Sequence, residues 1–210
     1  MNDLKNPITR ESKSRNNLLT LKKYCISFFI TLTLSIFCFS MSPNYSTTKY
    51  NIINSNEYYK NQIIDSLKRE VQLYINKIAP NSKVSADTII TACLKYKMDI
   101  CFVLAQGHLE SHFGTRGIAT LTNSVFNVGA MGDGIIIRTY KTPNSSVEPY
   151  IILLIEKYLN NGKSVDILIN NYKNKNGYRY AIAQNYEEQL KIIYYRLKDK
   201  TNINNLQNLL

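Results

Sequence analysis

The sequence predicts a mainly α-helical (α+β) protein with one transmembrane helix and a small β-hairpin. Three patterns support this: an uncharged apolar run at residues 24–41, apolar residues at three- and four-residue steps from residue 63, and two β-prone runs around a Gly- and Asp-rich turn at 129–134. The chain after Pro43, about 165 residues, is long enough for one domain with its own core.

The apolar run YCISFFITLTLSIFCFSM would extend about 27 Å as a helix, just enough to cross a bilayer. Six Lys or Arg residues precede it against Asp3 and Glu11, so the positive-inside rule places the N-terminus in the cytoplasm. We therefore expect a basic cytoplasmic tail at 1–23, a transmembrane signal-anchor at 24–42 and the rest outside the cytoplasm. The alternative is a secreted protein whose signal is cleaved near Ser40-Met41-Ser42.

Beyond the membrane segment the predicted elements are mostly helices. A polar linker at 43–56 leads into a helix at 63–78, so that residues 43–70 contain the linker and the start of a stalk helix. The further predictions are helices at 86–97 (N-cap Ser85), 100–113 (left-handed C-cap Gly114), 145–159 and 178–197, hairpin strands at 125–128 and 135–139, and a polar C-terminal tail at 201–210.

Both histidines of the chain occur in the octapeptide GHLESHFG at 107–114, with Glu110 midway between them. Metalloproteases place a Glu directly after the first His, whereas Glu110 follows His108 by two residues and points about 200° around the helix. No third His is present, so we expect no metal site, with a site completed by Asp or Glu as the alternative. We expect no cofactor.

Glu110 instead has the setting of a general acid. It falls in the last turn of the predicted helix, at the border of an apolar face, and it shares a neighbouring face with Gln106. The negative end of the helix dipole and an apolar surround both disfavour ionisation and raise the pKa of a carboxyl. A raised pKa allows such a group to donate a proton near neutrality.

The net charge indicates which binding partners the protein could have, and the cysteine positions indicate whether it forms a disulfide. The net charge of +11 suits general attraction to polyanions, but no dense basic run with interleaved aromatic residues indicates nucleic-acid binding. Cys93 and Cys101 lie on either side of a predicted helix-helix turn, a position that favours buried thiols over a disulfide.

Three motifs in order, AQGHLESHFGT, TNSVFNVGA and RYAIAQNYEEQL, resemble the glucosaminidase domain family of bacterial and phage peptidoglycan hydrolases, of the flagellar and autolysin type. The resemblance covers roughly residues 71–197. The matching residues are Ala105, Gln106, Glu110, Ser111, Gly114, Asn123, Phe126, Asn127, Tyr180, Ala181 and Tyr186.

The resemblance implies a lysozyme-like catalytic domain at 71–200, with the β-hairpin bordering its cleft. The implied activity is that of an endo-β-N-acetylglucosaminidase, which hydrolyses the glycan strand of peptidoglycan. Glu110 would be the general acid. The other catalytic candidates are Tyr180 and Asp133. The candidates for substrate binding are Gln106, Asn123, Phe126, Asn127 and Tyr186.

The second catalytic group is left open by the sequence. Family members often carry a second acid in a longer β-lobe, whereas Asp133 is the one acid of this hairpin and its Gly-Asp-Gly setting also suits a tight turn. Water positioned by Tyr180, or the substrate's own acetamido group, could replace a second carboxylate. A lytic transglycosylase, which uses one Glu, and a non-catalytic membrane-tethered glycan-binding module are the alternative functions.

Overall fold

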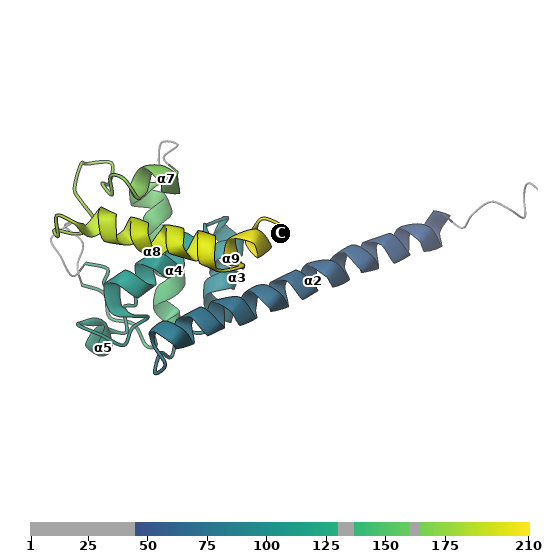
Figure 1. Ribbon diagram of the computed structural model, residues 1–210, viewed down its shortest axis with the longest axis horizontal. Helices are drawn as coiled ribbons and strands as arrows, with labels where there is room; N and C mark the ends of the chain where they lie inside the picture. The colour runs from purple at the N-terminus through teal and green to yellow at the C-terminus, as the bar shows by residue number, and fades with distance from the viewer. Residues whose placement is uncertain (1–44, 130–136, 160–163) are drawn as a thin grey trace, which may run out of the picture. The chain divides into compact units, whose positions relative to one another are not determined.

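The computed structural model describes residues 45–129, 137–159 and 164–210, which are mainly helical (Figure 1). Strand pairing within these ranges is limited to one isolated bridge between Lys173 and Arg179. The helices are α2 (Tyr45–Ile78), α3 (Ala86–Tyr96), α4 (Ile100–Ser111), α5 (Ala119–Thr122), the 3-10 helix η1 (Asn144–Ser146), α6 (Val147–Leu153), the π-helix η2 (Leu154–Tyr158), α7 (Val165–Leu168), α8 (Tyr186–Lys200) and α9 (Ile203–Gln207).

The chain divides into two compact units, Met1–Asn56 and Glu57–Leu210, and the features below belong to the second. The basic tail expected at 1–23 and the transmembrane segment expected at 24–42 lie outside the described residues. Among the helices that are described, none combines the length and apolar character needed to cross a membrane.

The predicted apolar face of α2 is confirmed, because Leu67 and Val71 are fully buried and Tyr74 and Ile78 pack against the core. Ile75, which the predicted stripe did not include, is also fully buried. The helix nevertheless begins at Tyr45, within the stretch where we expected a linker. Residues 45–79 contain neither Gly nor Pro, so nothing in the backbone stops the helix before Pro80.

The predicted cap of α3 is confirmed: Ser85 has an extended backbone and its side chain accepts a hydrogen bond from the Thr88 backbone N–H. Cys93 and Cys101 are buried free thiols, as the sequence predicted.

Helix α4 is the central element of this unit. Its residues from Ile100 to Gly107 are all buried, and it packs against α3, α8 and α9. Figure 1 shows α8 lying next to it. A helix that is apolar on every side is expected to be enclosed by its neighbours.

The end of α4 differs from the prediction. The helix ends at Ser111, and His112 rather than Gly114 is the left-handed C-cap. Phe113 and Gly114 are also left-handed, with φ of 53° and 82°. This path turns the Phe113 ring into the core, where the side chain is 1% exposed, and burial of that ring offsets the backbone strain of two non-glycine residues.

The first predicted hairpin strand, 125–128, is wrong. Val125 and Phe126 form a turn in which the Asn127 N–H donates to the Ser124 carbonyl, and Asn127 has a φ of 49°. A strand would alternate its side chains between two faces, whereas Val125 and Phe126 are consecutive and both fully buried. The turn residues 130–134 and Ile135 lie outside the described residues, and 137–139 have no regular structure.

The C-terminal predictions are correct in part. The helix expected at 145–159 appears as η1, α6 and η2, but α8 begins only at Tyr186 rather than near residue 178. The backbone before it is held by a different segment, since the Tyr180 N–H donates to the Tyr172 carbonyl. The expected polar tail at 201–210 instead contains α9, whose Ile203 is fully buried.

Candidate active site

Glu110 lies in the last turn of α4, where two side chains hold its partly buried carboxyl group. The Tyr186 hydroxyl, from the start of α8, donates to Oε1 at 2.5 Å. Asn127 Nδ2 donates to the backbone carbonyl of Glu110 at 2.7 Å and to Oε2 at 3.2 Å. Each carboxyl oxygen therefore has a hydrogen-bond donor of its own.

The pKa of Glu110 is raised from 4.5 to about 6 because burial disfavours the charged form. The hydrogen bonds from Tyr186 and Asn127 favour the carboxylate and limit the rise. The sequence also predicts a raised pKa for Glu110, and burial is the largest cause of the rise. A carboxyl with this pKa can both donate and accept a proton near neutral pH.

Behind Glu110 lies a fully buried glutamine, Gln106, one helical turn earlier on α4. Its Nε2 donates to the Tyr186 hydroxyl oxygen at 3.0 Å. Its Oε1 accepts from the hydroxyls of Tyr150 at 2.5 Å and Tyr172 at 2.7 Å. Side chains from α4, α6, α8 and the segment after α7 thus meet at one buried amide.

The aromatic rings around this amide are packed face to face and edge to face. Phe126 stacks on Tyr150 with centroids 3.7 Å apart, and Tyr172 stacks on Tyr180 at 4.7 Å. Tyr158 contacts both Tyr172 and Tyr180 edge-on. Such packing fixes the rings and therefore the directions of their hydroxyl groups.

The segment that carries Tyr172 and Tyr180 is tied to α8 by Glu187. This carboxylate accepts a hydrogen bond from the Tyr172 backbone N–H at 3.2 Å and forms an ion pair with Arg179. The interactions with Arg179 and the Tyr172 N–H lower the pKa of Glu187, although its partial burial opposes them.

Two serines fix the turn that carries Asn127. Ser111 Oγ, at the end of α4, donates to the Val125 carbonyl at 2.6 Å, and the Val125 N–H donates to Ser146 Oγ at 3.2 Å. The Ser111 that follows Glu110 in the sequence motif is therefore the link between the helix end and the turn.

The structure brings Glu110, Gln106, Asn127 and Tyr186 into one hydrogen-bonded group. The prediction of direct substrate contact is corrected for Gln106, which is fully buried under tyrosine rings. It is corrected also for Phe126, which is fully buried in the core and stacked on Tyr150.

The remaining candidates have mixed placements. Tyr186 is 7% exposed and directs its hydroxyl at Glu110 rather than outward. Tyr180 is equally buried and donates to the Phe126 carbonyl. Asn123 is the left-handed C-cap of α5, a conformation that asparagine tolerates, and its side chain donates to the Tyr140 carbonyl. Asp133 lies outside the described residues.

Tyr150, Tyr172 and Ser146 belong to this network but were not identified from the sequence. Tyr150 and Tyr172 are two of sixteen tyrosines and fall in none of the three motifs. The one local signal is a tyrosine at position 150 directly before the apolar run IILLI, where a hydroxyl needs a buried partner.

The rings of the two histidines contact each other, with centroids 5.0 Å apart. His108 Nδ1 is hydrogen-bonded to the Tyr74 hydroxyl of α2 at 2.7 Å. Burial and, secondarily, the neighbouring His112 lower the pKa of His108 to about 4. Within the described ranges, no cluster of three or more His, Cys, Asp or Glu side chains could hold a metal ion.

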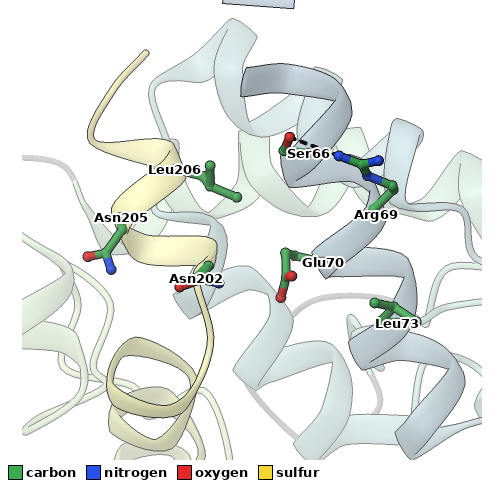
Figure 2. A pocket seen from close by; sticks show the side chains of 7 residues that line it. All are labelled: Ser66, Arg69, Glu70, Leu73, Asn202, Asn205 and Leu206. Atoms are coloured by element: carbon green, nitrogen blue, oxygen red, sulfur yellow. Dashed lines mark hydrogen bonds between the residues drawn. The ribbon is translucent and has the colours of Figure 1, made fainter. Parts of the chain in front are cut away.

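A surface cavity of about 380 Å³ lies elsewhere, between α2 and α9 (Figure 2). Polar and apolar side chains both line it, with Arg69 bonded to Ser66 on one wall and Asn202 and Asn205 on the other. None of the residues that line this cavity comes from α4 or the turn at Asn127.

Comparison with known proteins adds no relative: no family model matches this chain, and no curated protein or solved structure has significant similarity to it.

Proposed function

We propose that the protein is a peptidoglycan hydrolase, an endo-β-N-acetylglucosaminidase that uses Glu110 as its general acid. The observation that carries the proposal is the state of this carboxyl, which is partly buried at the end of α4, has a pKa of about 6 and is held by Tyr186 and Asn127. The three sequence motifs contribute the substrate class.

The proposed chemistry starts with transfer of the Glu110 proton to the glycosidic oxygen as the bond from that oxygen to the sugar carbon breaks. The bonding electron pair goes to the leaving oxygen, and a water molecule completes hydrolysis at the carbon. In this proposal Glu110, now a carboxylate, takes a proton from that water. On the opposite face of the sugar, either Asp133 or the substrate's own acetamido group would act at the reacting carbon.

In this proposal the helical unit has a lysozyme-like arrangement, with the segment around 125–139 bordering the substrate. The transmembrane helix at 24–42 displays it outside the cytoplasm, or a cleaved signal releases it. The net charge of +11 supports attraction to an anionic cell wall. The chemistry requires no cofactor, and EDTA should leave activity intact.

The test is the rate at which purified peptidoglycan releases reducing ends. We expect Glu110→Gln to lose at least about 100-fold in rate, the effect typical of a general acid, while Asp133→Asn keeps substantial turnover. Tyr180→Phe should fall between them, because loss of its bond to the Phe126 carbonyl loosens the turn that carries Asn127. Circular dichroism of each variant checks folding.

The alternatives give different results in the same assay. A glycan-binding module would bind peptidoglycan without releasing any ends, and Glu110→Gln would leave binding unchanged. An Asp133→Asn variant as inactive as Glu110→Gln, while still folded, would mean that the enzyme uses an acidic pair.

A further inference from the structure

The hydrogen bonds around Gln106 have a fixed direction. Each tyrosine hydroxyl carries one proton, and a glutamine amide has a carbonyl that only accepts and an NH₂ that only donates. Tyr150 and Tyr172 both direct their protons to Gln106 Oε1, and both side chains are fully buried.

Turning the amide over would break this arrangement. The hydroxyls of Tyr150 and Tyr172 would then face an NH₂ group, which accepts no proton. Their oxygens lie 3.4 Å apart, so one hydroxyl could donate to the other, but the second proton would have no acceptor. A buried hydroxyl proton without an acceptor is strongly disfavoured. The two tyrosines therefore fix Nε2 of Gln106 toward Tyr186.

This orientation determines what Tyr186 can do. Its oxygen accepts from Gln106 Nε2, so its single proton is directed at Glu110 Oε1. Oε1 is then an acceptor and cannot also donate to Tyr186. The proton of the neutral acid must be on Oε2, where Asn127 Nδ2 makes only its longer contact, 3.2 Å against 2.7 Å to the backbone carbonyl.

We propose that Gln106 is a positioning residue: held by Tyr150 and Tyr172, it sets the direction of the Tyr186 hydroxyl and so confines the transferable proton of Glu110 to Oε2. The transfer of this proton to a substrate rests on the proposed function, but the hydrogen-bond directions do not depend on it. When the Oε2–H bond breaks and the proton goes to the glycosidic oxygen, the charge left on Glu110 is already met at Oε1 by the Tyr186 O–H.

The most direct test uses the double variant Tyr150→Phe/Tyr172→Phe. Both hydroxyls contact Gln106 rather than Glu110, no charge is introduced, and the stacked rings are kept. Gln106 is then free to turn its carbonyl to Tyr186, and Glu110 loses a donor that favours its ionised form. We expect its pKa, measured by carbon-13 NMR of the carboxyl, to rise by about half a pH unit or more.

Tyr186→Phe sets the scale of the shift, because it removes the donor outright. The alkaline limb of the kcat/KM profile should move to higher pH in both variants by the same amount as the pKa. A Glu110 pKa that rises in Tyr186→Phe but stays at the wild-type value in the double variant would overturn the proposal. So would a pKa unaffected by Tyr186→Phe.

Gln106→Glu provides a second, independent arm. It replaces the donor that faces Tyr186 with an acceptor, so the Tyr186 proton should turn away from Glu110. Because the new carboxyl also adds charge, the substitution is made both in the wild type and in the Tyr186→Phe variant. The excess shift in the wild-type background measures the part that passes through the hydroxyl. Equal shifts in the two backgrounds would contradict the proposal.

The NMR measurement needs no substrate. A protein that proves inactive on peptidoglycan but shows the expected pKa changes would refute the proposed function and leave the role of Gln106 intact. Within the described ranges, the side chains that hydrogen-bond this carboxyl are Tyr186 of α8 and Asn127 of the turn, so the shifts can be assigned.

Discussion

At the residue scale, Glu110 is a carboxyl group whose burial opposes stability. Its pKa is about 6 in the folded protein against 4.5 for an ordinary glutamate, so between these values the folded state binds more protons than the unfolded state. Stability must therefore fall as pH rises from 4.5 through 6, and the loss persists above pH 6. The shift corresponds to about 2 kcal/mol at most.

This cost predicts the behaviour of Glu110→Gln. The variant has no charge to bury, so at pH 8 it should be more stable than the wild type by about 1–2 kcal/mol, whereas at pH 4 the two should be nearly equal. Urea denaturation at both pH values measures the difference. Equal or lower stability of the variant at pH 8 would show that the carboxylate is not destabilised.

The sequence could locate Glu110 and name Gln106, Asn127 and Tyr186 as candidates, but it could not predict that they form one hydrogen-bonded group. The GHLESHFG octapeptide places the carboxyl in the last turn of a helix, which is local information, and the structure confirms both this position and the direction of the pKa. Gln106 is different, because its buried environment is formed by Tyr150 and Tyr172, 44 and 66 residues away. Side-chain contacts at such separations leave no spacing pattern in one sequence.

At the element scale, α4 depends on the absence of a side chain at Gly107. A Cβ atom there would lie 3.1 Å from Phe113 Cε1 and 3.4 Å from Phe126 Cε1, and both rings are buried. The absence of a Cβ atom thus allows α4 to approach these two buried phenylalanines closely.

Gly107→Val should be strongly destabilising, by about 2 kcal/mol or more, because its extra methyl groups overpack two enclosed rings. Gly107→Ala is the matched control. Its close contact is offset by the better helix propensity of alanine, about 1 kcal/mol, so a change near zero is expected. Thermal unfolding of the two variants gives the comparison, and a Val variant as stable as the Ala variant would disprove the tight packing.

Helices α2 and α4 are joined by the Tyr74–His108 hydrogen bond, and this contact should respond to acid. The pKa of His108 is lowered to about 4 from 6.5, chiefly by burial and then by His112, Arg196 and Arg116. The unfolded state therefore binds the proton first, and stability should fall as pH drops from 6.5 towards 4.

His108→Gln removes the titrating group and keeps a polar side chain. We expect its unfolding midpoint to decrease less between pH 7 and pH 4.5 than that of the wild type. Parallel pH dependence of the two proteins would show that His108 titrates normally and contributes nothing in this range.

Element boundaries were harder to predict than element types. The residues around Tyr180 were predicted to begin the last helix, yet the Tyr180 backbone N–H donates to the Tyr172 carbonyl. Likewise Val125 and Phe126 have strand propensity but are both buried in a turn. In each case a tertiary contact outweighs a local preference.

At the scale of the whole molecule, the core extends from Leu67 in α2 to Ile203 in α9, beyond both ends of the domain expected at 71–200. Helix α9 also caps α4, because Gln207 Oε1 accepts a hydrogen bond from the Ile100 backbone N–H. The C-terminal residues are therefore part of the fold that positions Glu110.

Ile203→Ala should lower the free energy of unfolding by about 2–4 kcal/mol, as expected for a fully buried isoleucine. Leu209→Ala is the control, since Leu209 is 66% exposed and its loss should change stability by less than about 0.5 kcal/mol. Chemical denaturation tests both, and equal effects would mean that α9 does not pack on the core.

The measurement that tests the central claim most directly is mass spectrometry of purified peptidoglycan digested by the protein and by Glu110→Gln. We predict soluble fragments that end in a reducing N-acetylglucosamine with the wild type and none with the variant. Fragments lighter by one water, with 1,6-anhydro ends, would identify a lytic transglycosylase. The absence of any fragments from a folded wild-type protein would contradict the assignment of Glu110 as a general acid of glycan cleavage.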